Sequence, residues 1–289
     1  MKILKRFFID GLSGMAQGLF ATLIIGTILE QVGLLIGGNI GQVLAVGAAA
    51  AKVMTGAGIG VGVASRFQES VLVTVSSACA GMIGAYASKI MAGTLIVKGA
   101  VVLSGPGEPL GAFLAAYVGI ELGRLISGRT QLDILLTPLM TILSGGAVGL
   151  FLGPWISQLM ARLGDLIRWG TEQQPFLMGI VVSVLMGMAL TLPISSAALG
   201  VILNLSGIAA GAAAVGCSAQ MIGFAVASFR ENRIGGLIAQ GIGTSMLQVP
   251  NIVRKPLIWI PPILTSAVLG PVSTIVFKMT NNAIGSGMG

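Results

Sequence analysis

Histidine is absent from this chain, and charged side chains make up only 9% of its 289 residues. The missing imidazole excludes histidine metal ligands, histidine proton relays and a phosphohistidine within the chain. Soluble domains carry roughly 25% charged residues, so the shortage of charge argues against a soluble protein. With 55% hydrophobic residues and a mean hydropathy of +0.97, the composition indicates an integral membrane protein.

Cysteine is also scarce, and no basic surface with interleaved aromatic residues is present. Cys79 and Cys217 both lie in apolar runs, which favours small core residues over a disulfide or a reactive pair. The formal charge of +7 comes from cations spread thinly at segment ends, as expected for loops retained on the cytoplasmic side. We therefore expect no nucleic-acid partner, no metal site and no cofactor.

Long apolar runs make up most of the chain, and they are too long for the ~10-residue alternating strands of a membrane barrel. The 44 glycines suit close packing between membrane helices. A transmembrane helix with its loop takes about 25–35 residues. The sequence therefore predicts an all-α polytopic membrane protein with about nine to ten transmembrane helices, some of them re-entrant or broken.

One segment, residues 154–170, is amphipathic, with apolar and polar side chains on opposite helical faces. Trp155 and Trp169 bracket it, as residues that prefer the membrane interface do. We interpret it as an interfacial linker helix. It divides the chain into a first transmembrane repeat at residues 1–153 and a second at residues 171–289.

The two halves share short sequence echoes. Residues 18–26 match residues 179–187 with both terminal glycines in step, and residues 60–65 match residues 223–228. These echoes predict an internal duplication, and five crossings in the first half favour an inverted repeat. Transporters built in this way bind substrate near broken helices at the repeat interface.

Residues 105–111, with the sequence GPGEPLG, place a carboxylate between two prolines and three glycines. Prolines and glycines disfavour a continuous helix, so Glu108 is expected on bent backbone between Gly107 and Pro109. Such backbone persists in lipid only where protein buries it or water solvates it. We predict the tip of a re-entrant element that lines a polar pathway. The alternative is that Glu108 caps a helix beginning at Pro109.

Lys52 lies near the centre of the second apolar span, about 16 Å of helix from the nearer end. This depth predicts an anionic partner, a wet cavity or a break at the glycine run that follows. Lys52 is therefore a candidate substrate ligand. Glu30 is interpreted as an interfacial residue.

Three other polar residues are candidate substrate ligands. Asp133 either binds substrate or anchors a helix end by pairing with Arg129, much as Glu121 is expected to pair with an arginine three residues later. Ser195 and Ser196 follow a proline and offer hydroxyl groups to a sugar, or satisfy carbonyls freed at the helix break.

The order of four motifs resembles one family. The motifs are EPLGAF at residues 108–113, DILLTP at 133–138, PISSAA at 193–198 and GSGMG at 285–289. Together they are similar to the enzyme-IIC-like membrane proteins of the bacterial sugar phosphotransferase system, in the branch that includes toxin-regulator proteins related to the perfringolysin regulator. The resemblance covers nearly the whole chain.

This resemblance implies a multi-pass permease of the bacterial inner membrane, acting on sugar-like substrates as a homodimer together with separate phosphocarrier subunits. It also implies that Glu108 contacts substrate hydroxyls. We therefore predict alternating-access transport of a sugar or a similar small polar solute. A membrane sensor with a permease-like fold and a channel are the alternatives. The chain has no phosphorylating domain or catalytic motif, so its status as an enzyme stays open.

Overall fold

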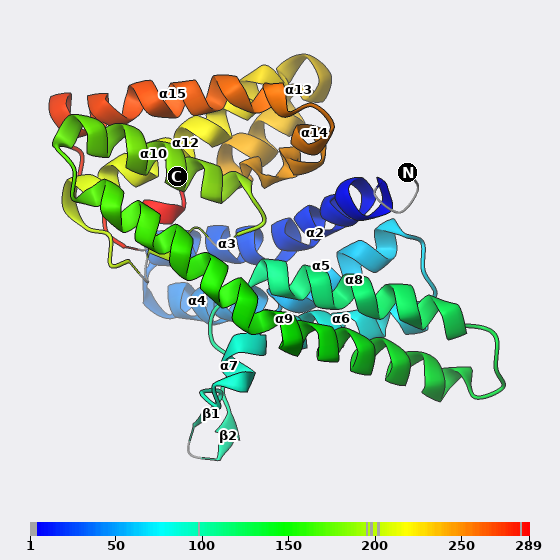
Figure 1. The fold of residues 1–289 in the computed structure, drawn as a ribbon. Coiled ribbons are helices and arrows are strands. Elements are labelled where there is room, and N and C mark those ends of the chain that lie inside the picture. Colours follow the sequence, from blue (N-terminus) through cyan, green and yellow to red (C-terminus); the bar gives the residue numbers. More distant parts are fainter. Residues whose placement is uncertain (1–4, 98, 195, 197–198, 201–202, 284) are drawn as a thin grey trace. The chain divides into compact units, whose positions relative to one another are not determined.

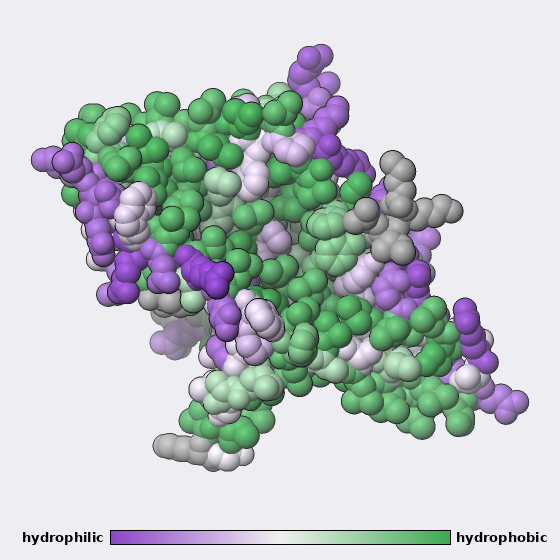
Figure 2. Space-filling view, in the orientation of Figure 1, coloured by the Kyte–Doolittle hydropathy of each residue, from purple (hydrophilic) through white to green (hydrophobic). Residues whose placement is uncertain are grey.

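The computed structural model describes residues 5–97, 99–194, 196, 199–200, 203–283 and 285–289 (Figure 1). It is 82% helical with almost no strands, and it divides into two compact units, Met1–Ser157 and Gln158–Gly289. Figure 2 shows hydrophobic side chains over most of the visible surface, with hydrophilic ones in separate patches at some helix ends and along part of α9. This surface and the helix content confirm an all-α membrane protein.

Five helices among the described residues are long and apolar enough to cross a membrane: Arg6–Ile36, Pro109–Ile126, Asp133–Thr171, Gly207–Ala227 and Pro256–Val276. The pair Gly38–Val53 and Thr55–Arg66, bent by 55°, makes a sixth if counted as one broken span. Two further apolar helices, Val71–Ala85 and Pro175–Thr191, are shorter. The expected broken helices are therefore present, whereas a total of nine to ten spans stays a prediction.

The first unit is built from these elements: η1 (Arg6–Gly11), α2 (Leu12–Leu19), η2 (Phe20–Ile24), α3 (Ile25–Ile36), α4 (Gly38–Val53), α5 (Thr55–Arg66), α6 (Val71–Ala85), α7 (Ala87–Met91), β1 (Ile96–Val97), β2 (Ala100–Val101), α8 (Pro109–Ile126) and the first part of α9 (Asp133–Thr171). The strands form a small antiparallel hairpin that pairs Ile96 with Val101. Helices α2, α5, α6 and α8 pack side by side along the chain order α2–α5–α6–α8.

Glycines explain the closeness of this packing. A Cβ atom on Gly14 of α2 would lie 2.6 Å from the carbonyl oxygen of Gly62 in α5, where no side chain fits. The spacing of small residues along α2 and α5 thus lets the two backbones touch, which is how membrane helices gain contact without large side chains. At the far end of the α3–α4 hairpin, Gly37 and Gly38 form the tight turn with positive φ angles of 67° and 59°.

The second unit contains the remainder of α9 and these elements: α10 (Pro175–Thr191), α12 (Gly207–Ala227), α13 (Phe229–Ile238), η3 (Ala239–Gly243), η4 (Ser245–Gln248), α14 (Val249–Arg254), η5 (Pro256–Trp259), α15 (Ile260–Pro271), η6 (Val272–Val276) and η7 (Gly285–Gly287). Helices α10, α12 and α15 pack against one another. Their core includes Val182, Met186 and Cys217, all fully buried.

The segment interpreted as a linker, residues 154–170, is the later part of α9, which runs through Pro154 without ending. Trp155 and Trp169 are exposed, whereas Ile156, Met160 and Ile167 are buried. One face therefore packs and the other does not, in agreement with an amphipathic helix. A position along the membrane surface, and the boundaries of two repeats, stay predictions.

Candidate functional site

The loop before α8 has the bent backbone that its sequence predicts. Gly105 and Gly107 adopt positive φ angles of 71° and 70°, a conformation that other residues rarely reach. Glu108 is extended, with φ −101° and ψ 110°, and α8 begins at Pro109. The missing N–H of proline is harmless at this first helical position, so the helix starts immediately after the carboxylate.

A second helix break lies directly against this loop. Helix α6 ends at Ala85, and Tyr86, with φ −108° and ψ 11°, separates it from α7. The Glu108 backbone N–H donates to the Ala85 carbonyl oxygen at 2.8 Å, and the Tyr86 hydroxyl donates to the Gly105 carbonyl oxygen. The two interrupted backbones thus satisfy each other's polar groups, as irregular backbone in a membrane protein requires.

Gly107 fixes the distance between these two breaks. A Cβ atom at this position would lie 2.8 Å from both the Cβ atom and the carbonyl oxygen of Ala85. Because glycine alone combines this contact with a positive φ angle, the loop is held against the end of α6. The side chain of Glu108 is therefore presented by a fixed loop.

The Glu108 carboxyl group has an unusual environment. The side chain caps no N–H group of α8 within hydrogen-bonding geometry, so the capping alternative is not observed. Its Oε1 atom is buried without a hydrogen-bond partner in the described structure. Glu108 lies in the loop just before the α8 span, and burial raises its pKa to about 7. The nearby N–H of Leu110 lowers the pKa, but this offsets only part of the increase. A buried polar atom left unpaired costs roughly 1–3 kcal/mol.

Lys52 has a different partner. Its Nζ atom lies 2.7 Å from Oε2 of Glu30 in α3, and α4 ends one residue later, before the bend into α5. The anionic partner predicted for a deep lysine is therefore present. The helix does break nearby, but at Met54 and not at the glycine run, which is continuous helix in α5. The interpretation of Glu30 as merely interfacial was incomplete, because the tight turn at Gly37 brings α3 back along α4. In the described structure the Lys52 ammonium group is paired with Glu30.

Asp133 lies at the start of α9, beyond the end of α8 that is remote from Glu108. It accepts hydrogen bonds from the Gly128 N–H at 2.8 Å and from the Thr137 hydroxyl at 2.6 Å. These contacts anchor a helix start, with Gly128 in place of the expected Arg129. The structure therefore does not bring Asp133 together with Glu108.

A charged cluster occupies this same end of the first unit. Arg6 donates to Glu121 and to Glu69 at 2.6 Å each, and Glu121 also pairs with Arg124 at 2.8 Å, the i,i+3 contact expected from the sequence. The Arg6 guanidinium further lies 3.8 Å from the ring centroid of Phe67. This cluster connects the beginning of the chain to the loop before α6, through Glu69, and to helix α8, through Glu121.

Of the two candidate serines, only Ser196 belongs to the described residues, and Ser195 lies outside them. The buried Ser196 hydroxyl donates to the carbonyl oxygen of Gly287 at 2.7 Å. It therefore satisfies backbone near the glycine-rich tail, which is the structural one of the two predicted roles.

The second unit holds a polar network that the sequence interpretation missed. The fully buried Gln220 of α12 accepts hydrogen bonds from Trp259 Nε1 at 2.9 Å and from the Thr191 hydroxyl at 3.3 Å. Thr191 also lies 2.8 Å from the buried hydroxyl of Ser245. A glutamine in the middle of an apolar helix was the available signal.

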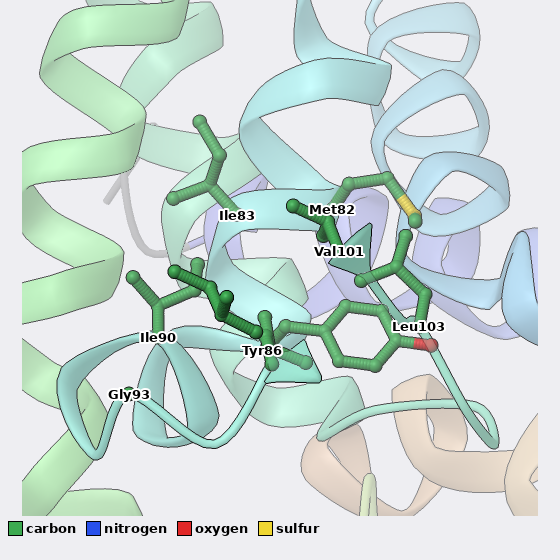
Figure 3. Close-up of a pocket in the computed structure, with 9 residues that line it drawn as sticks. Met82, Ile83, Tyr86, Ile90, Gly93, Val101 and Leu103 are labelled. Carbon is green, nitrogen blue, oxygen red and sulfur yellow. The ribbon is translucent and has the colours of Figure 1, made fainter. Parts of the chain in front are cut away.

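An apolar pocket of about 330 Å³ lies beside the Glu108 loop (Figure 3). Its lining residues are Met82, Ile83, Tyr86, Ile90, Gly93, Leu95, Ile96, Val101 and Leu103. Figure 3 shows the Tyr86 ring reaching toward Leu103. Because aliphatic groups dominate this wall, the pocket does not offer the hydrogen bonds that a sugar requires.

The sequence model of the family described as "Phosphotransferase system, EIIC" matches residues 9–289. The chain belongs to this family. The match confirms the resemblance drawn from the four motifs and makes the chain a multi-pass membrane permease component of a phosphotransferase system. In general, such a component acts on a sugar and associates with other proteins of its system. No curated protein and no solved structure matches the chain.

Proposed function

We propose that this EIIC protein moves a sugar, or a similar small polar solute, across the bacterial inner membrane by alternating access, with Glu108 as the principal substrate ligand. The observation that carries the proposal is the buried, unpartnered Oε1 atom of Glu108. An unsatisfied acceptor in a membrane protein is costly, and a substrate hydroxyl would satisfy it.

The chemistry of Glu108 suits this role. A carboxylate accepts hydrogen bonds from two neighbouring hydroxyl groups, and a protonated carboxyl group can also donate one. Because the pKa of Glu108 is raised to about 7, both forms are populated near neutral pH. The rigid loop on the end of α6 lets the carboxyl group meet a solute without first being ordered.

The placement of Gly107 and Pro109 assigns them supporting parts. Gly107 keeps the loop in contact with Ala85, and Pro109 starts the helix behind the carboxylate. Lys52, Asp133 and Ser196 have partners within the chain, so a direct part in binding would require those contacts to open.

The helix packing supports a duplicated transport unit. The first-half members of the two echoes are residues 18–26, in α2 and the helical segments that continue it, and residues 60–65, in α5. Helices α2 and α5 pack together. Their counterparts at residues 179–187 and 223–228 belong to α10 and α12, which also pack together. The same pairing inside each unit is what a repeat would produce. A homodimer and separate phosphocarrier partners complete the proposal.

Uptake of labelled sugars into proteoliposomes, with and without phosphocarrier proteins, tests the function. We expect Glu108→Gln to lower uptake at least about tenfold, which corresponds to one lost interaction of about 1.4 kcal/mol. Glu172→Gln, which neutralises an exposed acid, serves as the matched control.

If Glu108→Gln takes up sugar as well as the wild type, the assignment of Glu108 as a substrate-binding residue is wrong. No transport of any polar solute by the wild type would favour the sensor alternative instead. Uptake that persists unchanged without phosphocarrier proteins would identify a facilitator or an ion-coupled carrier.

A further inference from the structure

The apolar pocket beside the Glu108 loop is formed by one continuous stretch of chain, from Met82 in α6 to Leu103 after β2. Its outer rim consists of the small β-hairpin, where Ile96 is 66% and Val101 is 71% exposed. Figure 1 shows α7 and this hairpin turning away from the axis of α6. In a membrane protein, aliphatic groups exposed at such a rim face hydrocarbon.

A cation lies next to the pocket. The Nζ atom of Lys89 is 5.6 Å from the centroid of the Tyr86 ring, which forms one wall. Lys89 is exposed, donates only to the Ser104 carbonyl oxygen at 3.2 Å, and has no carboxylate partner in the part of the chain that the structure describes. Its charge is therefore available to an external anion.

We propose that this pocket binds one acyl chain of an anionic phospholipid, with the lipid phosphate held by Lys89. The pairing of an aliphatic cleft with an unpaired ammonium group matches the two ends of such a lipid. The volume of about 330 Å³ accommodates part of one chain and excludes a whole lipid. A sugar is disfavoured because the wall provides almost no hydrogen-bonding groups.

Tyr86 connects this lipid site with the Glu108 loop. Its ring lines the pocket, while its hydroxyl donates to the Gly105 carbonyl oxygen. An acyl chain against the ring restricts the rotation of Tyr86 and so stabilises the loop that presents Glu108. Only the relevance of this coupling to transport rests on the proposed function, because lipid binding itself requires no substrate.

Native mass spectrometry of the full-length protein in mild detergent tests the site, with dioleoyl-phosphatidylglycerol and dioleoyl-phosphatidylcholine as probes. Val101→Trp places an indole in the pocket from its exposed rim. Excluding about two methylene groups in this way should weaken phosphatidylglycerol retention about tenfold. Val97→Trp, on the paired strand and outside the lining, is the matched control and should retain the lipid.

Lys89→Gln tests the headgroup contact. We expect it to reduce the preference for phosphatidylglycerol over phosphatidylcholine about fivefold, since one lysine near anionic lipid contributes about that factor, and to leave phosphatidylcholine retention unchanged. Circular dichroism and gel filtration check that each variant is folded. If Val101→Trp does not fold, Ile96→Trp, at another exposed lining residue, replaces it.

Equal retention of phosphatidylglycerol by Val101→Trp and Val97→Trp would overturn the pocket assignment. Loss of a dimer in Val101→Trp with unchanged lipid retention would assign the pocket to a second copy of the chain and equally overturn the proposal.

Hydrogen–deuterium exchange tests the coupling independently of transport. Phosphatidylglycerol should slow exchange of the amides of Gly105, Gly107 and Glu108 in the wild type. Tyr86→Phe, which keeps the ring and loses the hydroxyl, should abolish this protection. Protection that persists in Tyr86→Phe, or its absence in the wild type, would refute the coupling.

Discussion

Ion pairs join helices and loops in the unit Met1–Ser157, whereas the side-chain contacts described in the unit Gln158–Gly289 are made by neutral groups. The first unit holds the ion pairs of Arg6, Lys52 and Arg124 and the unpartnered carboxyl oxygen of Glu108. Among the described residues of the second unit no ion pair is present, and its central group is the amide of Gln220.

The difference separates polar groups that pair with one another from a carboxyl oxygen that has no partner among the described residues. The amide and hydroxyl groups around Gln220 satisfy one another, and such hydrogen bonds average only about 0.6 kcal/mol each in a membrane protein. The carboxyl group of Glu108 lies near backbone alone, and its Oε1 stays unpaired. Under the proposed function, this open acceptor is the group that a substrate hydroxyl would satisfy.

The largest expected effect concerns the charged cluster of the first unit. Arg6→Ala leaves Glu69 and Glu121 without their shared guanidinium, and we expect it to lower the free energy of unfolding by about 3 kcal/mol. Arg6→Lys, which keeps the charge but not both directed contacts, should lose less. Chemical unfolding in mixed micelles measures both. Equal stability of Arg6→Ala and the wild type would mean that the charges of the first unit are merely solvated.

Breaking the hydrogen-bond network around Gln220 should cause a smaller loss of stability. Gln220→Leu removes the acceptor for the half-buried Trp259 Nε1, while the Thr191 hydroxyl keeps its contacts with Gly187 and Ser245. The change should cost about 1 kcal/mol. The same unfolding measurement applies, and Thr265→Val, at an exposed hydroxyl of α15, is the control. An unchanged stability of Gln220→Leu would contradict the view that this network holds the second unit together.

Replacing Glu108 should increase the stability of the protein, whereas Arg6→Ala and Gln220→Leu should decrease it. Because its folded-state pKa of about 7 lies above its ordinary value, the folded protein holds a proton that the unfolded chain releases between about pH 4.5 and 7. Stability should therefore fall as pH rises through this window. Glu108→Gln should remove this pH dependence and increase stability at pH 8 while uptake is lost. If Glu108→Gln is less stable than the wild type at pH 8, the Glu108 carboxylate stabilises the fold, which contradicts the prediction.

The smallest effect is expected at Asp133. Asp133→Asn keeps an oxygen acceptor for the Gly128 N–H and loses only the favourable charge at an exposed helix start, where solvent screens it. Sugar uptake should stay within about twofold of the wild type. A loss of uptake as large as that of Glu108→Gln would indicate that Asp133 also binds substrate. The substrate site would then extend along the whole of α8.

Local chemistry made several features predictable. Prolines and glycines restrict backbone angles wherever they occur, so the bend at residues 105–108, the helix start at Pro109 and the turn at Gly37 follow from neighbouring residues alone. The i,i+3 pair of Glu121 and Arg124 lies within one helix, where spacing fixes the contact.

Contacts between distant segments were not predictable in the same way. The position of Lys52 deep in an apolar span predicted an acidic partner. Only the packing of α3 against α4 identifies that partner as Glu30. Arg6 carried a positive-inside signal, and its bonds to Glu69 and Glu121 depend on three segments meeting. Ser196 presented two roles, and its bond to Gly287 indicates the structural one.

The sequence by itself determined that this protein is an all-helical membrane protein and that Glu108 lies on an interrupted backbone, and the order of its motifs indicated the EIIC family. Composition and local backbone restrictions act at each residue, so they can be interpreted without knowing the fold. Only the tertiary structure decided that the loop rests against the broken end of α6, that Tyr86 joins it to an apolar pocket, and that one oxygen of Glu108 stays unpaired. The reason is physical: a hydrogen bond is satisfied or left open by groups far apart in the chain, and packing alone brings them together.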